Sequence, residues 1–566
     1  MLPAWGSIYE KAQTYYQQTL SVIQLCATQP SFALQKIQQV NILGKILLRA
    51  NNFSLEENMG DTTTRRQFLK YASVGGTALG VGNLAFLTGL PAVSAQEAQV
   101  SPRLVRLDAG IEPLVRLIEE TPQSELLEKV AQRIRQGTTY QQVVAALFLA
   151  AVRNVQPRPS VGFKFHAVML VNAAHLTSLS SPEGDRWLAI FWALDQFKIS
   201  QADEQRATGW RMAPVDDSTV PPASRAKQAF IEAMESWDEK KADGAVAGLV
   251  RSAKADEIYE LFYRFGARDF RDIGHKNIFV ANSRRTLQFI GWQHAEPVLR
   301  SLAFALLHHD LKNTTPTRSD DEADRPWRRN QEQAARLGRQ WMAGKADDGA
   351  TREMLDVLRS GSNNDACDKA VELIGRGVSP QSIWDALFAG AGELLMRQPD
   401  VVMVHAVDST NALHYNFNAT GDEGTKKLLL LQNCAFLPMF RSMMRSKAAE
   451  VRIDDMKPLA LERPSEMIAE ILSDVSTNKM NAARKIRQYL NDGGQVQDLM
   501  NAARRLIFLK GSNAHDYKFS AGVLEDYFNV SPAWRSHFLA ASVFYLKGSG
   551  DKDNPLVART RTALKG

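Results

Sequence analysis

A ten-residue motif that occurs twice is the feature that most restricts how this chain can fold. The motif reads His-Ala-Val, three variable residues, Asn-Ala, one variable residue and His, and it spans His166–His175 and His405–His414. Six of its ten positions are identical, whereas composition alone would match roughly one position or fewer. The likeness indicates that one structural unit occurs twice in the chain.

The segments around the motif repeat with nearly the same offset. The two motifs lie 239 residues apart (166 to 405), while Gly137 and Gly377, like His275 and His515, lie 240 apart. A change of one residue over such a distance is an ordinary loop insertion. The sequence therefore predicts a tandem duplication of a unit of about 240 residues, with a pseudo-twofold arrangement of its copies.

Each copy has the hydrophobic spacing of helices. Leu126, Val130 and Ile134 form an i, i+4, i+8 stripe, and Thr121 before it is a candidate helix cap. Gly137 supplies a residue that can end the helix in the left-handed conformation. Alternating patterns typical of strands are scarce. We expect an all-α protein.

The domain organisation follows from the repeat and from turn-rich segments. We expect helical copy 1 at residues 96–345 and helical copy 2 at residues 346–566. A cluster of Gly and Asn predicts a hinge between them near residues 343–364, and a polar, charged stretch predicts a surface loop near residues 313–325.

Composition excludes several classes of protein. With 45% hydrophobic and 23% charged residues, the chain is neither disordered nor fibrous. Its net charge of +6 falls to +3 once the first 95 residues are removed, so we expect no nucleic-acid partner. Three cysteines allow at most one disulfide, which we expect between Cys367 and Cys434.

An N-proximal segment has the layout of an export signal. Arg65 and Arg66 precede an apolar, Gly-rich run over residues 71–90, and small residues then lead to Ala95. This segment resembles a bacterial twin-arginine signal peptide. The resemblance implies cleavage after Ala95, the twin-arginine export machinery and signal peptidase as partners, and a periplasmic or otherwise exported protein. We expect no stable membrane span after cleavage, because glycines and polar residues dilute the run.

The start of the chain conflicts with this signal, which should be close to the first residue. Met59 directly precedes the twin-arginine box and is the expected true start, so that residues 59–95 form the signal peptide. Residues 1–58 would then lie upstream of the start. The alternative is a genuine N-terminal element, since residues 40–48 are apolar.

Histidines are the main candidates for a functional site. Six of the ten histidines form repeat-related pairs, and histidine is a common metal ligand. A metal ion is therefore the cofactor that we consider. The candidate metal ligands are His166, His175, His275, His405, His414 and His515, and the candidate pocket adds Asn172, Asn411, His294 and Glu296.

Helix geometry limits which histidines can meet. Nine residues on a straight helix advance by about 900°, so His166 and His175 face opposite sides and cannot bind one ion together. Asn172 shares a face with His175, as Asn411 does with His414. The alternative to a metal site is that these imidazoles cap helices or bond to backbone carbonyls.

A second set of candidates comes from a segment that mixes carboxylates, His, Trp and Arg. It runs from Arg268 to Pro297 and contains His294 and Glu296, which would suit an acid/base pair beside an aromatic wall. Leu539 stands opposite Glu296 in the second copy, so that carboxylate belongs to copy 1 alone. The alternative is a set of solvated charges at helix ends.

The repeated motif resembles the His-containing helices of questin-oxidase-like proteins, a family with an oxidative activity on aromatic polyketides. The resemblance covers ten residues in each copy, and Met169 in one copy stands where the other has Asp408. It implies an oxidative activity and assigns no catalytic residue.

Two functions follow from these observations. The first is an exported, His-lined and metal-dependent enzyme of the oxidoreductase type, with its pocket near the interface of the copies. The second is a non-catalytic periplasmic scaffold or binding protein, in which the histidines are structural. Convergence of three or more imidazoles within about 5 Å would favour the first.

Overall fold

The computed structural model describes residues 103–158, 163–179, 181–310 and 314–565. All of them belong to a compact unit that spans residues 87–566. The expected upstream segment (1–58) and the expected signal peptide (59–95) lie outside the described residues.

The described residues form helices and no strand, which confirms the prediction of an all-α protein. Their one β-type pairing is an isolated bridge between Lys345 and Val378. The α-helices are α4 (Glu112–Glu120), α5 (Gln123–Arg135), α6 (Tyr140–Asn154), α7 (Phe163–Leu179), α8 (Leu188–Ala207), α9 (Ala223–Ser236), α10 (Glu239–Ser252), α11 (Ala255–Gly266), α12 (His275–Ile290), α13 (Ala295–Leu306), α14 (Arg325–Arg336), α15 (Asp348–Ser360), α16 (Asn363–Gly375), α17 (Pro380–Arg397), α18 (Val401–Ala419), α19 (Glu423–Ser442), α20 (Met467–Thr477), α21 (Lys479–Asn491), α22 (Val496–Lys510), α23 (Ala514–Asn529), α24 (Pro532–Ser542) and α25 (Leu556–Lys565). Short 3₁₀ turns are η3 (Glu183–Asp185), η4 (Asp217–Thr219), η5 (Arg271–Gly274), η6 (Trp292–His294), η7 (Pro316–Arg318) and η8 (Pro464–Glu466).

Local sequence sets several of these helix ends. The hydroxyl of Thr139 accepts the backbone N–H of Gln142 at 3.2 Å and so begins α6, and Ser379 caps α17 in the same way. Gly137 has a φ of +102°, which suits the predicted helix stop. Thr121 does not cap α5, because that helix begins one residue after Pro122 and has no side-chain cap.

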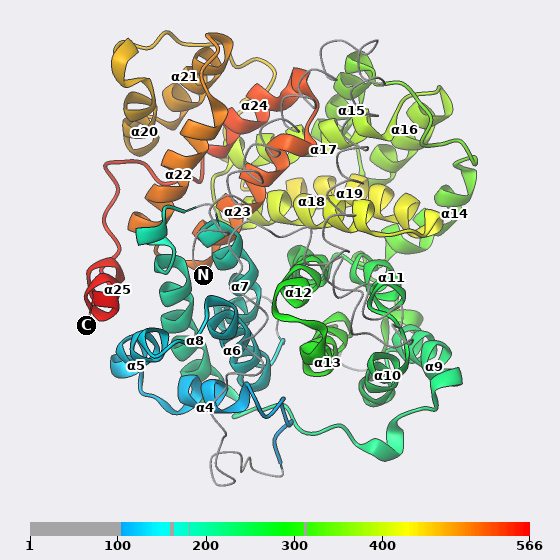
Figure 1. Cartoon of the computed structure of the whole chain (residues 1–566). Helices are drawn as coiled ribbons and strands as arrows, with labels where there is room; N and C mark the ends of the chain where they lie inside the picture. The colour runs from blue at the N-terminus through cyan, green and yellow to red at the C-terminus, as the bar shows by residue number, and fades with distance from the viewer. Residues whose placement is uncertain (1–102, 159–162, 180, 311–313, 566) are drawn as a thin grey trace, which may run out of the picture. The chain divides into compact units, whose positions relative to one another are not determined.

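Four helices form the centre of the structure. Helix α7 packs against α12 and α23, and α18 packs against the same two helices (Figure 1). Every residue of α18 from Met403 to His414 is buried, so this part of the helix has no solvent face. Polar side chains in this stretch of α18 therefore point into protein.

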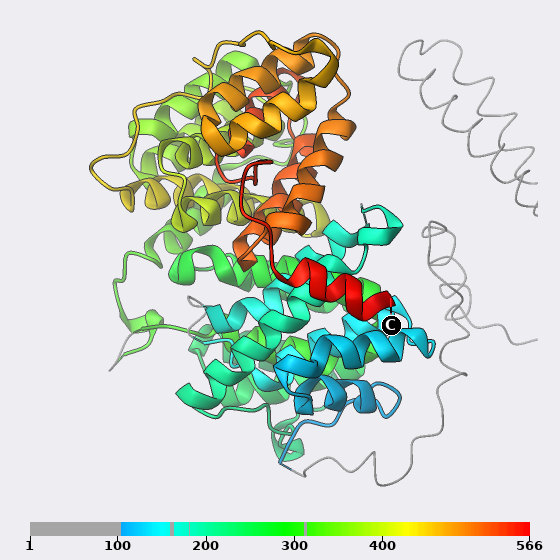
Figure 2. The same ribbon diagram turned by 90° about the vertical axis from the view of Figure 1, so that its left-hand side faces the viewer.

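The end of the chain returns to its early helices. Helix α25 packs against α5 and α8 (Figure 2). Arg559 on α25 forms an ion pair with Glu128 on α5 at 2.7 Å. The final helix therefore packs against helices from the early part of the described chain.

Two local predictions were wrong. The hinge expected near residues 343–364 contains helix α15, because Asp347 accepts the backbone N–H of Ala350 and caps thirteen helical residues. The disulfide expected between Cys367 and Cys434 is not formed. Both thiols are free and buried, and the Cys367 thiol donates to the carbonyl of Leu431 at 3.3 Å.

Within the part of the chain that the structure describes, no helix combines the length and the apolar character needed to cross a membrane.

Candidate functional site

Four histidines from the four central helices meet at one point. The Nε2 atoms of His275 and His405 are 2.8 Å apart. Ring nitrogens of His166, His275 and His405 all lie within 4.8 Å of one another. The ring centroid of His515 lies 4.6 Å from that of His166 and 4.9 Å from that of His405. All four side chains are buried.

Each of these histidines lies near the N-terminus of its helix. His275 is the first residue of α12 and His515 the second residue of α23. His166 and His405 follow within five residues of the starts of α7 and α18. Helix N-termini carry partial positive charge, so a position in or next to the first turn of a helix disfavours a protonated imidazole.

Burial reinforces this effect. It lowers the pKa values of His275, His405 and His515, and the neighbouring histidines and the ammonium group of Lys518 lower them further. These three imidazoles are therefore neutral at physiological pH, which is the form that binds metal ions.

One hydrogen bond orients the ring of His405, whereas one ring nitrogen of His275 and one of His515 have no partner among the described residues. Nδ1 of His405 lies 2.6 Å from the carbonyl oxygen of Val401, which requires a proton on Nδ1 and leaves Nε2 with its lone pair. Among the described residues, Nδ1 of His275 and Nε2 of His515 have no hydrogen-bond partner. Backbone bonding of one nitrogen with the other directed into a cluster is typical of metal-ligating histidines.

A turn with strained backbone directly precedes His275. Asp272 and Ile273 have φ values of +61° and +47°, and Gly274 follows at +83°. Left-handed backbone at two non-glycine residues costs of order 1–3 kcal/mol each and persists only when surrounding contacts hold it.

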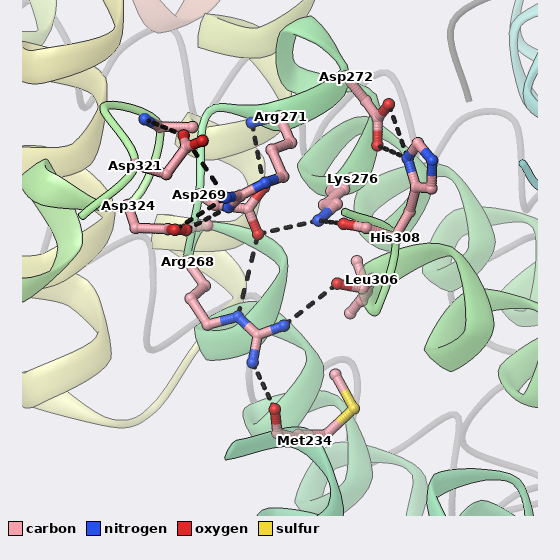
Figure 3. Close-up of polar contacts among 12 residues, drawn as sticks. Met234, Arg268, Asp269, Arg271, Asp272, Lys276, Leu306, His308, Asp321 and Asp324 are labelled. Carbon is pink, nitrogen blue, oxygen red and sulfur yellow. Dashed lines mark hydrogen bonds and ion pairs between the residues drawn. The ribbon is translucent and has the colours of Figure 1, made fainter. Parts of the chain in front are cut away.

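Buried ion pairs hold this turn in place (Figure 3). The carboxylate of Asp272 lies 2.9 Å from Nδ1 of His308, and Arg271 pairs with Asp324. Lys276 donates to Asp269 at 2.9 Å. The sequence left two interpretations of this charged segment, an acid/base site or solvated charges at helix ends. The observed contacts instead bury its charged side chains around the turn that precedes His275.

A charged pair lies one helical turn beyond the histidines, toward the C-termini of α18 and α23. Asp408 follows His405 by three residues and Lys518 follows His515 by three, so each shares a helix face with its histidine. Asp408 Oδ2 and Lys518 Nζ are 3.7 Å apart and both side chains are buried. Burial raises the pKa of Asp408 to about 6 and lowers that of Lys518. In the sequence, Asp408 is apparent only as a mismatch with Met169 in the repeated motif, although its spacing of three residues from His405 indicates a shared helix face.

The second histidine of each motif lies elsewhere. His175 stacks on Phe289 with 3.9 Å between ring centroids, and its Nδ1 lies 3.3 Å from the hydroxyl of Tyr140. His414 packs edge-on against Trp384. The opposite faces predicted for the two motif histidines are therefore observed, and His175 and His414 are not among the clustered side chains.

The other predicted pocket residues are placed as follows. Asn172 donates to Asn282 at 3.2 Å, and Asn411 donates to Asp526 at 2.8 Å, both within the four-helix centre. His294 is buried next to Gln293, outside those four helices. Glu296 pairs with Arg251 at 3.0 Å in an exposed setting on α13.

A cavity lies outside the four central helices. Its volume is about 290 Å³, and its walls include Trp237, Arg264, Arg268 and Trp327. Arg268 stacks on Trp237 at 3.6 Å from the ring centroid. None of the residues lining this cavity belongs to α7, α12, α18 or α23.

Comparisons of the chain with protein-family models, with curated proteins and with solved structures gave no match.

Proposed function

We propose that this protein binds one transition-metal ion through His166, His275 and His405, with His515 beside them, and that the ion serves an oxidoreductase-type activity. The observation that carries the proposal is the convergence of ring nitrogens from three helices within 4.8 Å, in a buried setting. It meets the criterion of three imidazoles within about 5 Å.

The residues fit an ion of this kind. Nitrogens that bind Zn²⁺ tetrahedrally at 2.0–2.1 Å are about 3.3 Å apart, so small side-chain shifts bring the three rings to ligand distance. Imidazole ligands suit Zn, Cu, Fe and Ni, of which Cu and Fe exchange electrons. Three histidines also leave a coordination position open, as catalytic sites require.

One observation favours a structural role for the same histidines. Nε2 of His275 and Nε2 of His405 are 2.8 Å apart, which is the distance of a hydrogen bond between neutral rings. A non-catalytic periplasmic scaffold or binding protein, held together by this bond, is therefore the second candidate function.

We also propose that the chain is a tandem duplication with pseudo-twofold symmetry. His166 and His405 are related by the sequence repeat, and so are His275 and His515. The site would then take two histidines from each copy, and neither copy would form it alone. A twofold axis that superposes α7 and α12 on α18 and α23 in an experimental structure would test this.

Export of the chain in its folded state agrees with a metal site whose ligands come from helices far apart in the sequence. We propose that residues 59–95 direct the protein to the twin-arginine machinery and that signal peptidase cleaves after Ala95. That route carries folded proteins, so a metal bound between helices distant in sequence could be inserted before transport. Replacement of Arg65 and Arg66 by Lys should abolish export, as measured by fractionation of the producing cells.

Elemental analysis tests the metal site. Protein produced from Met59, exported and purified without chelator, should contain one transition-metal ion per chain. A His275→Ala/His405→Ala variant should lose it. The matched control is His175→Gln/His414→Gln, which changes buried histidines on α7 and α18 that lie outside the cluster.

The outcomes separate the two functions. Metal retained in the control and lost in a folded test variant supports the metal centre, and reversible reduction of bound Cu or Fe, followed by electron paramagnetic resonance, supports the redox role. A folded parent protein that remains free of metal after incubation with Cu²⁺, Fe²⁺ and Zn²⁺ overturns the proposal in favour of the scaffold.

A further inference from the structure

The cavity beside Trp237 and Trp327 has the size and the graded burial of a small-molecule site. Its buried lining residues are Trp237, Phe265, Arg268, Pro316 and Asp324. Its exposed lining residues, on the solvent side, are Glu235, Thr317, Arg328 and Gln331. The volume of about 290 Å³ is near the lower limit of small-molecule sites, which measure about 300–1,000 Å³. A ligand of one or two rings therefore suits it.

Three aromatic rings line the cavity. Phe265 belongs to α11 and Trp327 to α14, and Trp237 is the residue that ends α9. Trp237 has a φ of +58°, a left-handed backbone that bulky residues rarely adopt. Strain of this kind persists where surrounding contacts hold it, and it is common at ligand sites. The walls thus favour a flat, apolar group.

Arg264 brings a cation to the cavity wall without a carboxylate to neutralise it. Its side chain is half-buried, and its guanidinium lies 5.3 Å from the ring centroid of Trp327. Among the described residues it forms neither a hydrogen bond nor an ion pair. All five N–H donors of Arg264 are therefore available to a ligand.

Arg268 adds a second, deeper cation (Figure 3). It donates to the carbonyl oxygens of Met234 and Leu306, whereas its buried Nε has no hydrogen-bond partner among the described residues. The carboxylate of Asp269 lies 3.9 Å from this Nε, too far for a hydrogen bond, and accepts from Lys276 at 2.9 Å instead. Arg268 thus remains a buried cation with an unused donor.

The other charged residues that line the cavity are paired or exposed. Both carboxylate oxygens of Asp324 accept from Arg271. Arg328 donates to Asp320 at 2.8 Å, and Glu235 is exposed. The two arginines that remain give the cavity a positive charge, so its ligand should be an anion. One negative charge suits it better than two, because Asp324 and Glu235 also line the cavity.

We propose that this cavity binds a planar aromatic carboxylate of one or two rings. The guanidinium of Arg264 pairs with the carboxylate, because its planar fork matches two carboxylate oxygens. The ring packs against the aromatic wall that Trp237 and Trp327 form. The site is separate from the proposed metal centre, since its lining residues lie outside α7, α12, α18 and α23.

Calorimetric titration of the exported protein with 2-naphthoate tests the site. One molecule should bind per chain. Three comparison compounds each lack one feature of the proposed ligand: 2-naphthalenemethanol lacks the charge, cyclohexanecarboxylate lacks the planar ring, and 2-naphthyl phosphate carries a second negative charge. Each of them should bind at least tenfold more weakly than 2-naphthoate.

Variants of the wall locate the binding. Arg264→Gln should bind 2-naphthoate at least tenfold more weakly, and Arg264→Lys should recover part of the loss because it keeps the charge without the fork. Trp327→Leu should weaken binding through loss of the ring. The matched control is Arg225→Gln, which removes the same charge from an exposed position on α9 and should bind like the parent.

Each outcome decides the proposal. A parent that binds no 2-naphthoate, or binds a comparison compound as tightly, overturns the aromatic carboxylate as ligand. Equal affinity in the parent and in Arg264→Gln places the carboxylate elsewhere, on the metal for example, and overturns the site. The melting temperature and metal content of each variant are measured, so that a loss of fold or of metal is distinguished from a loss of ligand. Arg264→Gln should keep the fold, because Arg264 forms no hydrogen bond among the described residues.

Discussion

Arg285 and Glu525 form an ion pair at 2.8 Å although they lie 240 residues apart in the chain. That separation equals the offset between His275 and His515. The two partners thus occupy corresponding positions of the sequence repeat, yet they carry opposite charges. Identical charges at these two positions could not form this ion pair.

We expect this pair to be energetically coupled. Arg285→Leu should lower the free energy of unfolding by about 1–2 kcal/mol, less than for a fully buried pair because Glu525 is partly exposed. The double variant with Glu525→Leu should lose less than the sum of the single changes, as measured by denaturant unfolding. The neighbouring Arg284–Asp256 pair is the control, since Asp256 is 85% exposed. Additive effects at Arg285 and Glu525 would contradict the coupling.

Removal of the metal should lower thermal stability. An ion that binds only the folded chain stabilises it by about 2.7 kcal/mol at a free concentration of 100 times Kd. Dialysis against a chelator should therefore lower the melting temperature, and restoring the ion should raise it. The His275→Ala/His405→Ala variant should show no such response. An equal response in that variant would place the ion elsewhere.

Much of the architecture could be predicted from sequence because local physics decides it. The helix stripe from Leu126 to Ile134 and the caps at Thr139 and Ser379 depend on residues within one or two turns. The prediction of a hinge near residues 343–364 failed because Gly and Asn clusters indicate flexible backbone, whereas the Asp347 cap and the apolar residues of α15 make the segment helical.

The site was predictable only in part. The repeat pointed to the histidines, and helix geometry separated His166 from His175. The partners of these residues depend on packing between helices far apart in sequence. The charged pair of Asp408 and Lys518 and the strained turn before His275 therefore appeared only in the structure.

Acid should destabilise the protein through His175 and His414. Burial lowers both pKa values to about 4, so the folded chain binds fewer protons than the unfolded chain below pH 6.5. Their contribution is full above pH 6.5 and is lost as the pH falls toward 4, by about 3 kcal/mol for each histidine. Stability curves of His175→Gln and the parent should diverge as pH rises from 4 to 6.5, in favour of the parent. A pH-independent difference would contradict the neutral, buried state.

The turn before His275 should be sensitive to a single methyl group. Gly274 has a φ of +83°, and a Cβ at this position would lie 2.7 Å from the hydroxyl oxygen of Ser409 on α18. Gly274→Ala should therefore lower the free energy of unfolding through backbone strain and through this clash, by about 1–3 kcal/mol together.

A second change separates the two causes. Ser409→Gly removes the Cβ and hydroxyl that the new methyl group meets, but it leaves the left-handed backbone of residue 274 unchanged. Gly274→Ala/Ser409→Gly should therefore recover the steric part of the loss and keep the backbone part, once the effect of Ser409→Gly alone is subtracted. Metal affinity should follow stability, because residue 274 directly precedes His275 and a displaced turn moves its imidazole. If Gly274→Ala leaves both stability and metal affinity unchanged, the strained turn does not position His275.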